Sequence, residues 1–135
     1  MNTQDNVTLI KKLYASSMDV WEEHLSENFT WMHPQRMEYD KKGFIDYFNW
    51  LYDSLPDIEV PIEIFASEDD NVVVKFEVKA TMTKDIRVPG LSEPFKAHNK
   101  PISWIGLDLY QFKNGKIIRC ETYANSQLVM EQFQS

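Results

Sequence analysis

The chain has 135 residues, a formal net charge of −7 and an aromatic content of 13%. This length fits one domain over residues 1–135, with a hydrophobic core large enough to fold without disulfide bonds or metal ions. The chain is acidic and its Lys and Arg are scattered, which argues against nucleic acid as a partner. One cysteine excludes a disulfide within the chain, and no apolar run suits a secretory signal or a membrane span, so we expect a cytoplasmic protein without a membrane partner.

Residues 2–17 predict an amphipathic helix, because apolar residues recur along them at helical spacing. The apolar stripe includes Tyr14, which therefore points toward whatever the helix covers. A core tyrosine bonded to the backbone and a catalytic tyrosine both fit this position. A second, short helix is expected over residues 19–24, with Asp19 near its start, where an acid favours the helix dipole.

Residues 28–33 predict a short strand that ends before Pro34. Strand alternation puts Phe29, Trp31 and His33 on one face. At the end of a strand, His33 can reach into the mouth of a pocket, although a single histidine is more often structural than catalytic. Both interpretations of His33 stay open on the sequence alone.

A longer helix is expected over residues 40–55. Asp40 is a plausible N-cap, and Pro56 stops the helix. The apolar stripe of this helix includes Phe48, which faces the core. Trp50 falls off that stripe and therefore belongs at a rim or an interface.

The hydrophobic period then changes from helical to two, which indicates strands. Residues 58–66 predict a strand in which Pro61 indicates either a sheet edge or a bulge. A turn over residues 68–71 joins it to a more regular strand over residues 72–82, and the two make an antiparallel hairpin. The inward residues of the second strand are Val74, Phe76, Val78, Ala80 and Met82.

Residues 84–100 contain Pro-Gly, a further proline and mixed polarity. They predict a long irregular excursion with a short strand around residues 95–98. A long loop in a compact domain is often a lid over a site, and a mobile surface loop is the alternative.

Residues 101–125 hold the strongest local signal in the chain, two strand-like runs around Lys113-Asn114-Gly115. Asn-Gly suits the positive φ angles of a tight hairpin turn. The first run places Asp108 in an otherwise apolar strand, where an unpaired carboxylate is costly to bury. Asp108 therefore points either to water or into a pocket in which its pKa is put to use. Asn125 caps a terminal helix over residues 126–133.

Strand alternation sorts the residues of this hairpin into two faces. The face of Asp108 also carries Trp104, Gly106, Tyr110 and Phe112, and the second run has Cys120, Thr122 and Ala124 on one face and Arg119, Glu121 and Tyr123 on the other. From the inward faces of all elements we expect a pocket lined by Trp31, Phe48, Phe76, Val78, Trp104, Tyr110, Cys120 and Thr122.

Helices gathered on one face of an antiparallel sheet make an α+β fold. The element order, and above all the tail LDLYQFKNGKIIRCETYANSQLVMEQF, resembles the nuclear transport factor 2-like superfamily, in particular its SnoaL-like polyketide cyclases and ketosteroid isomerase. The resemblance covers essentially the whole chain. It implies a cone-shaped fold in which a curved antiparallel sheet wraps around the N-terminal helices and encloses an apolar pocket. It also implies a homodimer through the outer sheet face, where Arg119, Glu121 and Tyr123 lie.

The resemblance further implies roles for individual residues. Tyr14 and Asp108 match the tyrosine and the protonated aspartic acid that hold a substrate oxygen in ketosteroid isomerase, and His33 falls where that enzyme has its general-base aspartate. Asn125 stands where SnoaL-like cyclases use an aspartic acid; it cannot take a proton and is equally well explained as a helix cap. His98 lies where related cyclases place a histidine and is, with Asn125, a reserve candidate.

Tyr14, His33 and Asp108 together predict an enzyme that performs isomerase-, dehydratase- or cyclase-type acid–base chemistry on a small hydrophobic carbonyl compound. A non-catalytic domain that binds a small hydrophobic molecule or dimerises is the alternative. In a third interpretation, Asp108 and His33 only hydrogen-bond each other as a structural pair. Three histidines and one cysteine show no zinc-ligand spacing, so no metal and no other cofactor is expected.

Overall fold

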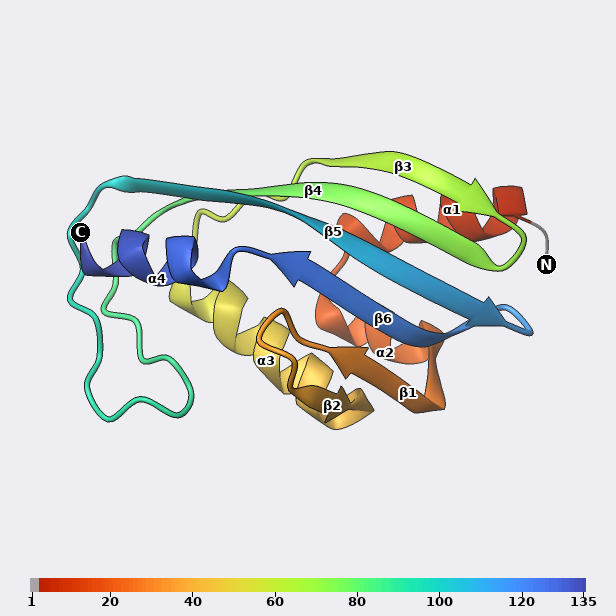
Figure 1. Cartoon of the computed structure of the whole chain (residues 1–135), viewed down its shortest axis with the longest axis horizontal. Coiled ribbons are helices and arrows are strands. Elements are labelled where there is room, and N and C mark those ends of the chain that lie inside the picture. The colour runs from red at the N-terminus through yellow and green to blue at the C-terminus, as the bar shows by residue number, and fades with distance from the viewer. Residues whose placement is uncertain (1–2) are drawn as a thin grey trace.

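The computed structural model describes residues 3–135, so the predicted helix start at residue 2 lies outside the described residues. Within this part of the chain, helices and strands follow one another in an order that confirms the predicted α+β class (Figure 1). The helices are α1 (Thr3–Tyr14), α2 (Met18–His24), α3 (Lys41–Ser54) and α4 (Ser126–Gln134). The strands are β1 (Leu25–Met32), β2 (Glu38–Asp40), β3 (Ile62–Glu68), β4 (Asn71–Thr81), β5 (Pro101–Lys113) and β6 (Lys116–Ala124). None of the helices described between residues 3 and 135 is long and apolar enough to cross a bilayer.

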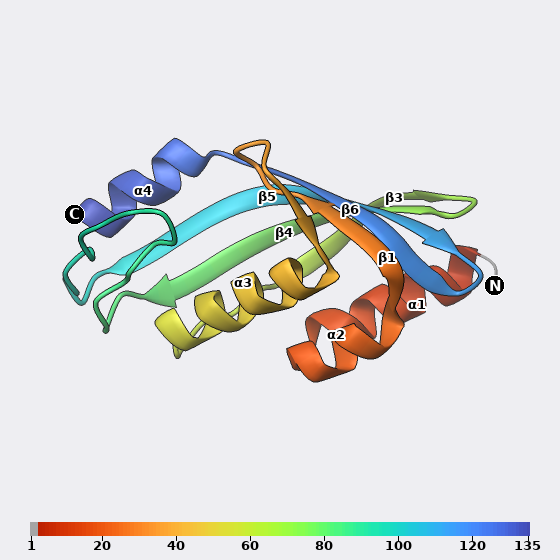
Figure 2. The ribbon, with the colours of Figure 1, turned by 90° about the horizontal axis from the view of Figure 1, so that it is seen from below.

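The strands form one curved sheet in the order β2-β1-β6-β5-β4-β3. Figure 2 shows α1, α2 and α3 against one face of this sheet, and in Figure 1 α4 lies at the opposite end from α1. Register shifts in the β1–β6, β3–β4 and β5–β6 pairs mark irregularities of the β-bulge kind, which bend strands and increase the local twist. The bent sheet can therefore wrap around the helices, as the family resemblance implied.

Neighbouring strands are antiparallel with one exception, because β1 pairs with β6 in parallel. The sheet, expected to be antiparallel throughout, is therefore mixed. Parallel strands need a long crossover connection, and the chain between β1 and β6 provides one. The pairing sets Trp31 beside Cys120 and so brings the end of β1 next to the middle of the C-terminal hairpin.

The helix predicted to reach residue 17 ends at Tyr14, and β1 begins at Leu25 rather than at residue 28. The differences at β3 and β2 have physical reasons. β3 begins at Ile62 rather than at residue 58, since Pro61 has no N–H to offer a neighbouring strand; β3 is an edge strand, one of the two predicted alternatives. β2 has no counterpart in the prediction, because a strand of 3 residues owes its existence to pairing with β1 rather than to its own pattern. Asp40 caps α3 as predicted, and its Oδ1 accepts a hydrogen bond from the Gly43 N–H at 2.8 Å.

The 84–100 segment is irregular, as predicted, but the strand expected at residues 95–98 is absent from the described chain and only a single bridge joins Ile86 to Phe95. The segment packs against both neighbouring helices. The Trp50 indole of α3 donates to the Arg87 carbonyl at 2.9 Å, and Lys100 Nζ donates to the Ser135 carbonyl beyond α4 at 2.9 Å. These bonds and the buried Ile86 side chain favour a packed cover over a free surface loop.

Gly106 marks a close approach inside the sheet. It lies opposite Phe76 in the β4–β5 pair. A Cβ atom at this position would be 2.4 Å from Cζ of Phe76 and 2.6 Å from the carbonyl oxygen of Tyr123. Only glycine therefore lets the Phe76 ring lie across β5.

Replacing Gly106 with alanine is expected to lower the free energy of unfolding by about 1–3 kcal/mol, the usual cost of overpacking a tight position. Urea denaturation followed by circular dichroism measures the change. Ser103→Ala, at an exposed position of the same strand, is the matched control and should cost less than about 0.5 kcal/mol. A Gly106→Ala variant as stable as the wild type would contradict the close packing of Phe76.

Candidate active site

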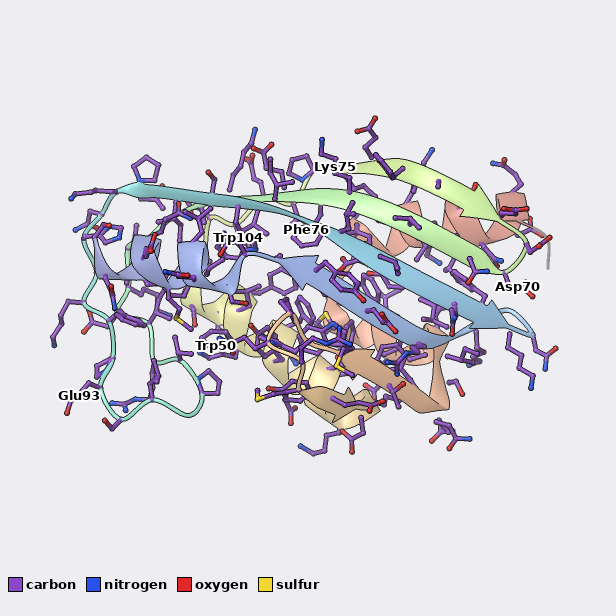
Figure 3. All side chains as sticks on the ribbon, viewed as in Figure 1. Trp50, Asp70, Lys75, Phe76, Glu93 and Trp104 are labelled. Carbon is purple, nitrogen blue, oxygen red and sulfur yellow. The ribbon has the colours of Figure 1, made fainter. Side chains whose placement is uncertain are left out.

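A cavity of about 140 Å³ lies between the inner face of the sheet and the helices, and its wall is mainly aromatic. Figure 3 shows three of its rings, Phe76 and Trp104 on the sheet and Trp50 between α3 and the 84–100 segment. An engineered cavity of about 150 Å³ holds benzene, so the enclosed space suits roughly one aromatic ring. Met37, also on the wall, is 49% exposed and marks a side that is open to solvent.

The structure places the three predicted catalytic side chains, Tyr14, His33 and Asp108, on the wall of this one cavity. The predicted pocket residues that also line it are Trp31, Phe48, Phe76, Val78, Trp104, Tyr110 and Thr122. Cys120 is outside the lining, a correction to the sequence prediction. Its thiol is buried in the core cluster and lies 3.8 Å from Thr122 Oγ1. Strand alternation therefore predicted correctly that Cys120 is on the inner face of the sheet, but not that it lies in the packed core rather than at the cavity.

Hydroxyl groups from three elements surround Asp108 in the middle of β5. Oδ1 accepts a hydrogen bond from Thr122 Oγ1, on the facing position of β6, at 2.6 Å. Oδ2 accepts one from the Tyr14 hydroxyl of α1. The Tyr110 hydroxyl is 3.4 Å from Oδ2 and 2.5 Å from the Tyr14 oxygen. Both carboxyl oxygens therefore have partners, the condition under which such a group can be buried.

Trp31 fixes the direction of hydrogen bonding on one side of this carboxyl group. Its Nε1–H can only donate, and it donates to Thr122 Oγ1 at 2.8 Å. The Thr122 hydroxyl then gives its own proton to Asp108 Oδ1. Oδ1 thus acts as an acceptor, and any proton on the carboxyl group belongs on Oδ2, beside Tyr14 and Tyr110.

Burial raises the pKa of the Asp108 carboxyl from 3.8 to about 6, while the hydrogen bonds from Thr122, Tyr14 and Tyr110 favour the ionised form and limit the rise. Burial, and next to it the charge of Asp108, raises the pKa of Tyr14 well above its ordinary value, so this phenol stays a proton donor near neutral pH. A carboxyl group with a pKa near the working pH is suited both to take and to give a proton.

His33 belongs to a second, separate hydrogen-bonded pair. The backbone N–H of Gln35 donates to His33 Nδ1 at 3.0 Å, and His33 Nε2 is 3.2 Å from the Tyr47 hydroxyl. Burial lowers the pKa of the imidazole. Among the described residues no hydrogen bond joins His33 to Asp108, which contradicts the interpretation of the two as a mutual structural pair.

The reserve candidates His98 and Asn125 both lie outside the cavity lining. His98 Nε2–H donates to the Gln132 carbonyl at 2.8 Å and thereby ties the 84–100 segment to α4. Asn125 Oδ1 accepts from the Leu128 N–H at 3.0 Å, which is the predicted helix cap. Within residues 3–135, no group of three or more His, Cys, Asp or Glu side chains could hold a metal ion.

Several residues of the cavity wall carry polar groups that sequence reasoning did not assign to the site, among them Trp21, Tyr47 and Tyr52. Trp21 packs edge-on against Tyr14 at 5.4 Å between ring centroids, and its buried Nε1–H has no partner within the described chain. Tyr47 and Tyr52 face the cavity from α3, and burial together with the charge of Asp108 raises the pKa of Tyr52. Helical periodicity identifies an inward stripe, but it does not say which turn of the helix lies opposite a carboxyl group.

The model of the SnoaL-like polyketide cyclase family matches residues 7–133 of the chain. Among solved structures, a protein named a SnoaL-like polyketide cyclase from Jannaschia sp. CCS1 has a TM-score of 0.83 and 19% identity, covering 98% of this chain and 94% of that one. AclR from Streptomyces galilaeus, named a hydroxylase, has a TM-score of 0.75 and 15% identity, covering 96% and 78%. TerC, co-crystallised with polyporic acid, has a TM-score of 0.73 and 14% identity, covering 97% and 99%. No curated protein sequence matches the chain.

Asp108 should make the stability of the fold depend on pH. Because folding raises its pKa from 3.8 to about 6, the folded state holds the proton more tightly, and this stabilisation is full below pH 3.8 and lost as the pH rises through about 6. We expect the free energy of unfolding of the wild type to fall relative to that of Asp108→Asn by roughly 2 kcal/mol between about pH 4 and pH 7. Urea denaturation at each pH measures it, and a difference that stays constant or has the opposite sign would contradict a raised pKa.

Proposed function

The chain belongs to the SnoaL-like polyketide cyclase family, and on this premise we propose that it is an enzyme that uses its own side chains, without a cofactor, for acid–base chemistry on a small hydrophobic carbonyl compound. The observation that carries the proposal is the Asp108 carboxyl group, buried at the wall of an aromatic cavity with hydroxyl donors at both oxygens. Isomerase-, dehydratase- and cyclase-type reactions can share one step, the removal of a proton from a carbon next to a carbonyl group.

Asp108 is the group best suited to that step. With a pKa of about 6 it is mostly ionised at neutral pH and remains a useful base. Its Oδ2 is the oxygen that can take the proton, since Thr122 holds Oδ1 as an acceptor. The neighbouring phenols of Tyr14 and Tyr110 line the same cavity and supply donors for the charge that develops on the substrate.

In the proposed step, the C–H bond next to the carbonyl group breaks and its proton passes to Asp108 Oδ2. The electron pair of that bond forms a C=C bond to the carbonyl carbon, and the π pair of the C=O bond moves to the oxygen, which gives an enolate. Once Oδ2 carries a proton, Tyr14 is released from donating to it and can donate to the enolate oxygen instead. Return of the proton to another carbon, loss of a leaving group, or attack of the enolate carbon on a second carbonyl group completes an isomerisation, an elimination or a cyclisation.

His33 was the residue predicted to move the proton. The single lone pair of His33 Nδ1 already accepts from the Gln35 N–H, and Nε2 faces the Tyr47 hydroxyl. A carboxylate oxygen such as Asp108 Oδ2 has two lone pairs, so it can accept a hydrogen bond and still offer a lone pair to a proton. The proposed step therefore runs through Asp108, and a catalytic role for His33 stays a prediction.

The lining of the cavity supports an uncharged, largely apolar substrate. Among its described residues there is no Lys or Arg, so an anionic group would find no cation and would face the Asp108 carboxylate. Aromatic side chains supply flat apolar surface for a ring. The co-crystal of TerC with polyporic acid, in the same fold, is consistent with a small-molecule ligand. The same wall would serve the alternative function, a domain that binds such a molecule without converting it.

Exchange of the methyl protons of acetophenone for deuterium in D₂O, followed by NMR, measures proton removal next to a carbonyl group without knowledge of the natural substrate. The wild type should accelerate this exchange, and the rate should rise with pH and level off above about 6, because the ionised Asp108 is the base. Asp108→Asn should lower the contribution of the protein by about 10²–10⁴-fold.

Glu63→Gln makes the same change from carboxyl to amide on the exposed side of β3 and should leave the exchange rate unaltered. Acceleration that survives in Asp108→Asn would overturn the proposal. Binding of acetophenone without any acceleration by the wild type would favour the non-catalytic alternative.

We also propose a homodimer through the outer face of the sheet, supported by the apolar residues that this face exposes. Ile105 is 56% exposed and Tyr123 45% exposed. Leu107 of β5 is half-buried and lies opposite Tyr123 of β6. Contiguous exposed apolar surface of this kind is typical of interaction sites, and a second copy of the same face would cover it.

Light scattering coupled to size-exclusion chromatography should therefore give twice the mass of the chain at micromolar concentration. Ile105→Glu should give the monomer mass, because it places two like charges in the interface. Leu128→Glu, at a similarly exposed leucine of α4, is the control and should remain dimeric. A monomeric wild type would contradict the dimer.

A further inference from the structure

We propose that Tyr47, oriented by His33, is the hydrogen-bond donor that recognises an acceptor oxygen of the ligand at a second polar point of the cavity. The inference rests on the proposed function only in taking the same cavity as the ligand site. It assigns a binding role to a tyrosine that has no part in the proton transfer at Asp108, and it makes His33 a positioning residue.

The hydrogen bonds of His33 determine which of its nitrogens carries the proton. Nδ1 accepts a hydrogen bond from the backbone N–H of Gln35 at 3.0 Å, so Nδ1 uses its lone pair as an acceptor and carries no proton. A neutral imidazole must then carry its proton on Nε2. The turn after β1 holds this arrangement, since the Arg36 N–H donates to the His33 carbonyl and the His33 N–H to the Met37 carbonyl.

The same reasoning leaves the Tyr47 hydroxyl with a proton to give. His33 Nε2–H donates to the Tyr47 oxygen, 3.2 Å away. Tyr47 therefore acts as the acceptor in this pair, and among residues 3–135 its hydroxyl forms no other hydrogen bond. Burial raises the pKa of Tyr47 to about 12, so the phenol keeps its proton under ordinary conditions. The ring lines the cavity, where a bound acceptor could receive that proton.

Aromatic neighbours hold the Tyr47 ring in place. Its centroid is 4.9 Å from that of Trp31, 5.3 Å from that of Trp50 and 5.4 Å from that of Phe48. A donor that is already fixed loses little conformational freedom when a ligand binds, so its hydrogen bond contributes more of its strength to affinity.

This arrangement selects a chemical class of ligand. The hydroxyl of Tyr47 can donate to an acceptor of the ligand such as a ketone, quinone or ester oxygen. The surrounding aromatic rings favour a ligand that is otherwise flat and apolar. A carboxylate or phosphate finds no cation among the described lining residues. The ligand class is therefore a neutral aromatic molecule with an acceptor oxygen placed away from the group that reacts at Asp108.

1,4-Diacetylbenzene and 4-isopropenylacetophenone form a matched pair of probes, because both keep one acetyl group for the Asp108 end and the second replaces the other carbonyl oxygen of the first with a CH₂ group. Titration of each into the full-length protein, followed by tryptophan fluorescence, gives their affinities. We expect the wild type to bind the diketone about 3- to 10-fold more tightly, the usual worth of one hydrogen bond. Tyr47→Phe should abolish this preference.

Tyr123→Phe, the same substitution on the outer face of the sheet, should retain it. A preference that persists in Tyr47→Phe, or that is missing from the wild type, would overturn the inference. If the preference instead disappears in Tyr14→Phe, the acceptor oxygen sits at the Asp108 end, and the proposed function stands while the role of Tyr47 falls.

A second measurement needs no ligand. Long-range ¹H–¹⁵N correlation spectra distinguish a ring nitrogen that carries a proton from one that does not, and His33→Gln identifies the His33 signals among those of the three histidines. We expect a neutral ring with the proton on Nε2 at pH 7.5. A proton on Nδ1 would leave Tyr47 to donate to His33, with nothing to give a ligand, and would overturn the inference whatever the exchange activity at Asp108.

Discussion

The structure depends on the burial of one carboxyl group. Asp108 sits in the middle of a long strand and faces an aromatic cavity, where an unpaired charge would be prohibitively costly. Its partners come from far apart in the sequence, Tyr14 from α1 and Thr122 from β6. Trp31 of β1 adds a further layer by donating to Thr122, which is possible because β1 runs parallel to β6. The site is complete only when the helix, the hairpin and this parallel pair have all assembled.

The cavity has two polar groups, and their hydrogen bonds run in opposite directions. At Asp108, hydroxyl groups point their protons inward toward a group whose charge changes near pH 6. At His33 and Tyr47, a backbone N–H fixes a neutral ring and leaves a phenol proton available to the cavity. Trp31 lies between the two, with its nitrogen on Thr122 and its ring against both His33 and Tyr47. One indole therefore connects the group that we propose transfers a proton with the group that we propose binds the ligand.

Local sequence signals predicted most of the fold. The Asn-Gly turn, the cap at Asp40 and the alternation around Asp108 depend on neighbouring residues, and all three are found in the structure. The 3-residue β2 and the parallel pairing of β1 could not be predicted this way, because both depend on contacts between distant segments.

The sequence could predict which side chains of the site face inward, but not which hydrogen bonds they form. Tyr14 and Asp108 lie on such faces, and the family resemblance joined them before the structure showed their hydrogen bond. The partners of His33 depend on the turn that follows β1 and on where α3 crosses the sheet, and neither has a sequence pattern of its own. The same holds for Cys120, which was correctly predicted to face inward but is buried in the core instead of lining the cavity.

The hydroxyl groups around Asp108 also explain why this site should work differently from ketosteroid isomerase. There, an apolar site pushes the pKa of the equivalent acid above about 9, so that it stays neutral and donates a hydrogen bond. Here burial acts in the same direction, but the donors from Thr122, Tyr14 and Tyr110 stabilise the carboxylate and hold the pKa at about 6. The acid thus changes from a fixed donor to a group that titrates. In the proposed mechanism this titrating acid removes the proton itself, and that mechanism needs no second aspartate at the positions of His33 and Asn125.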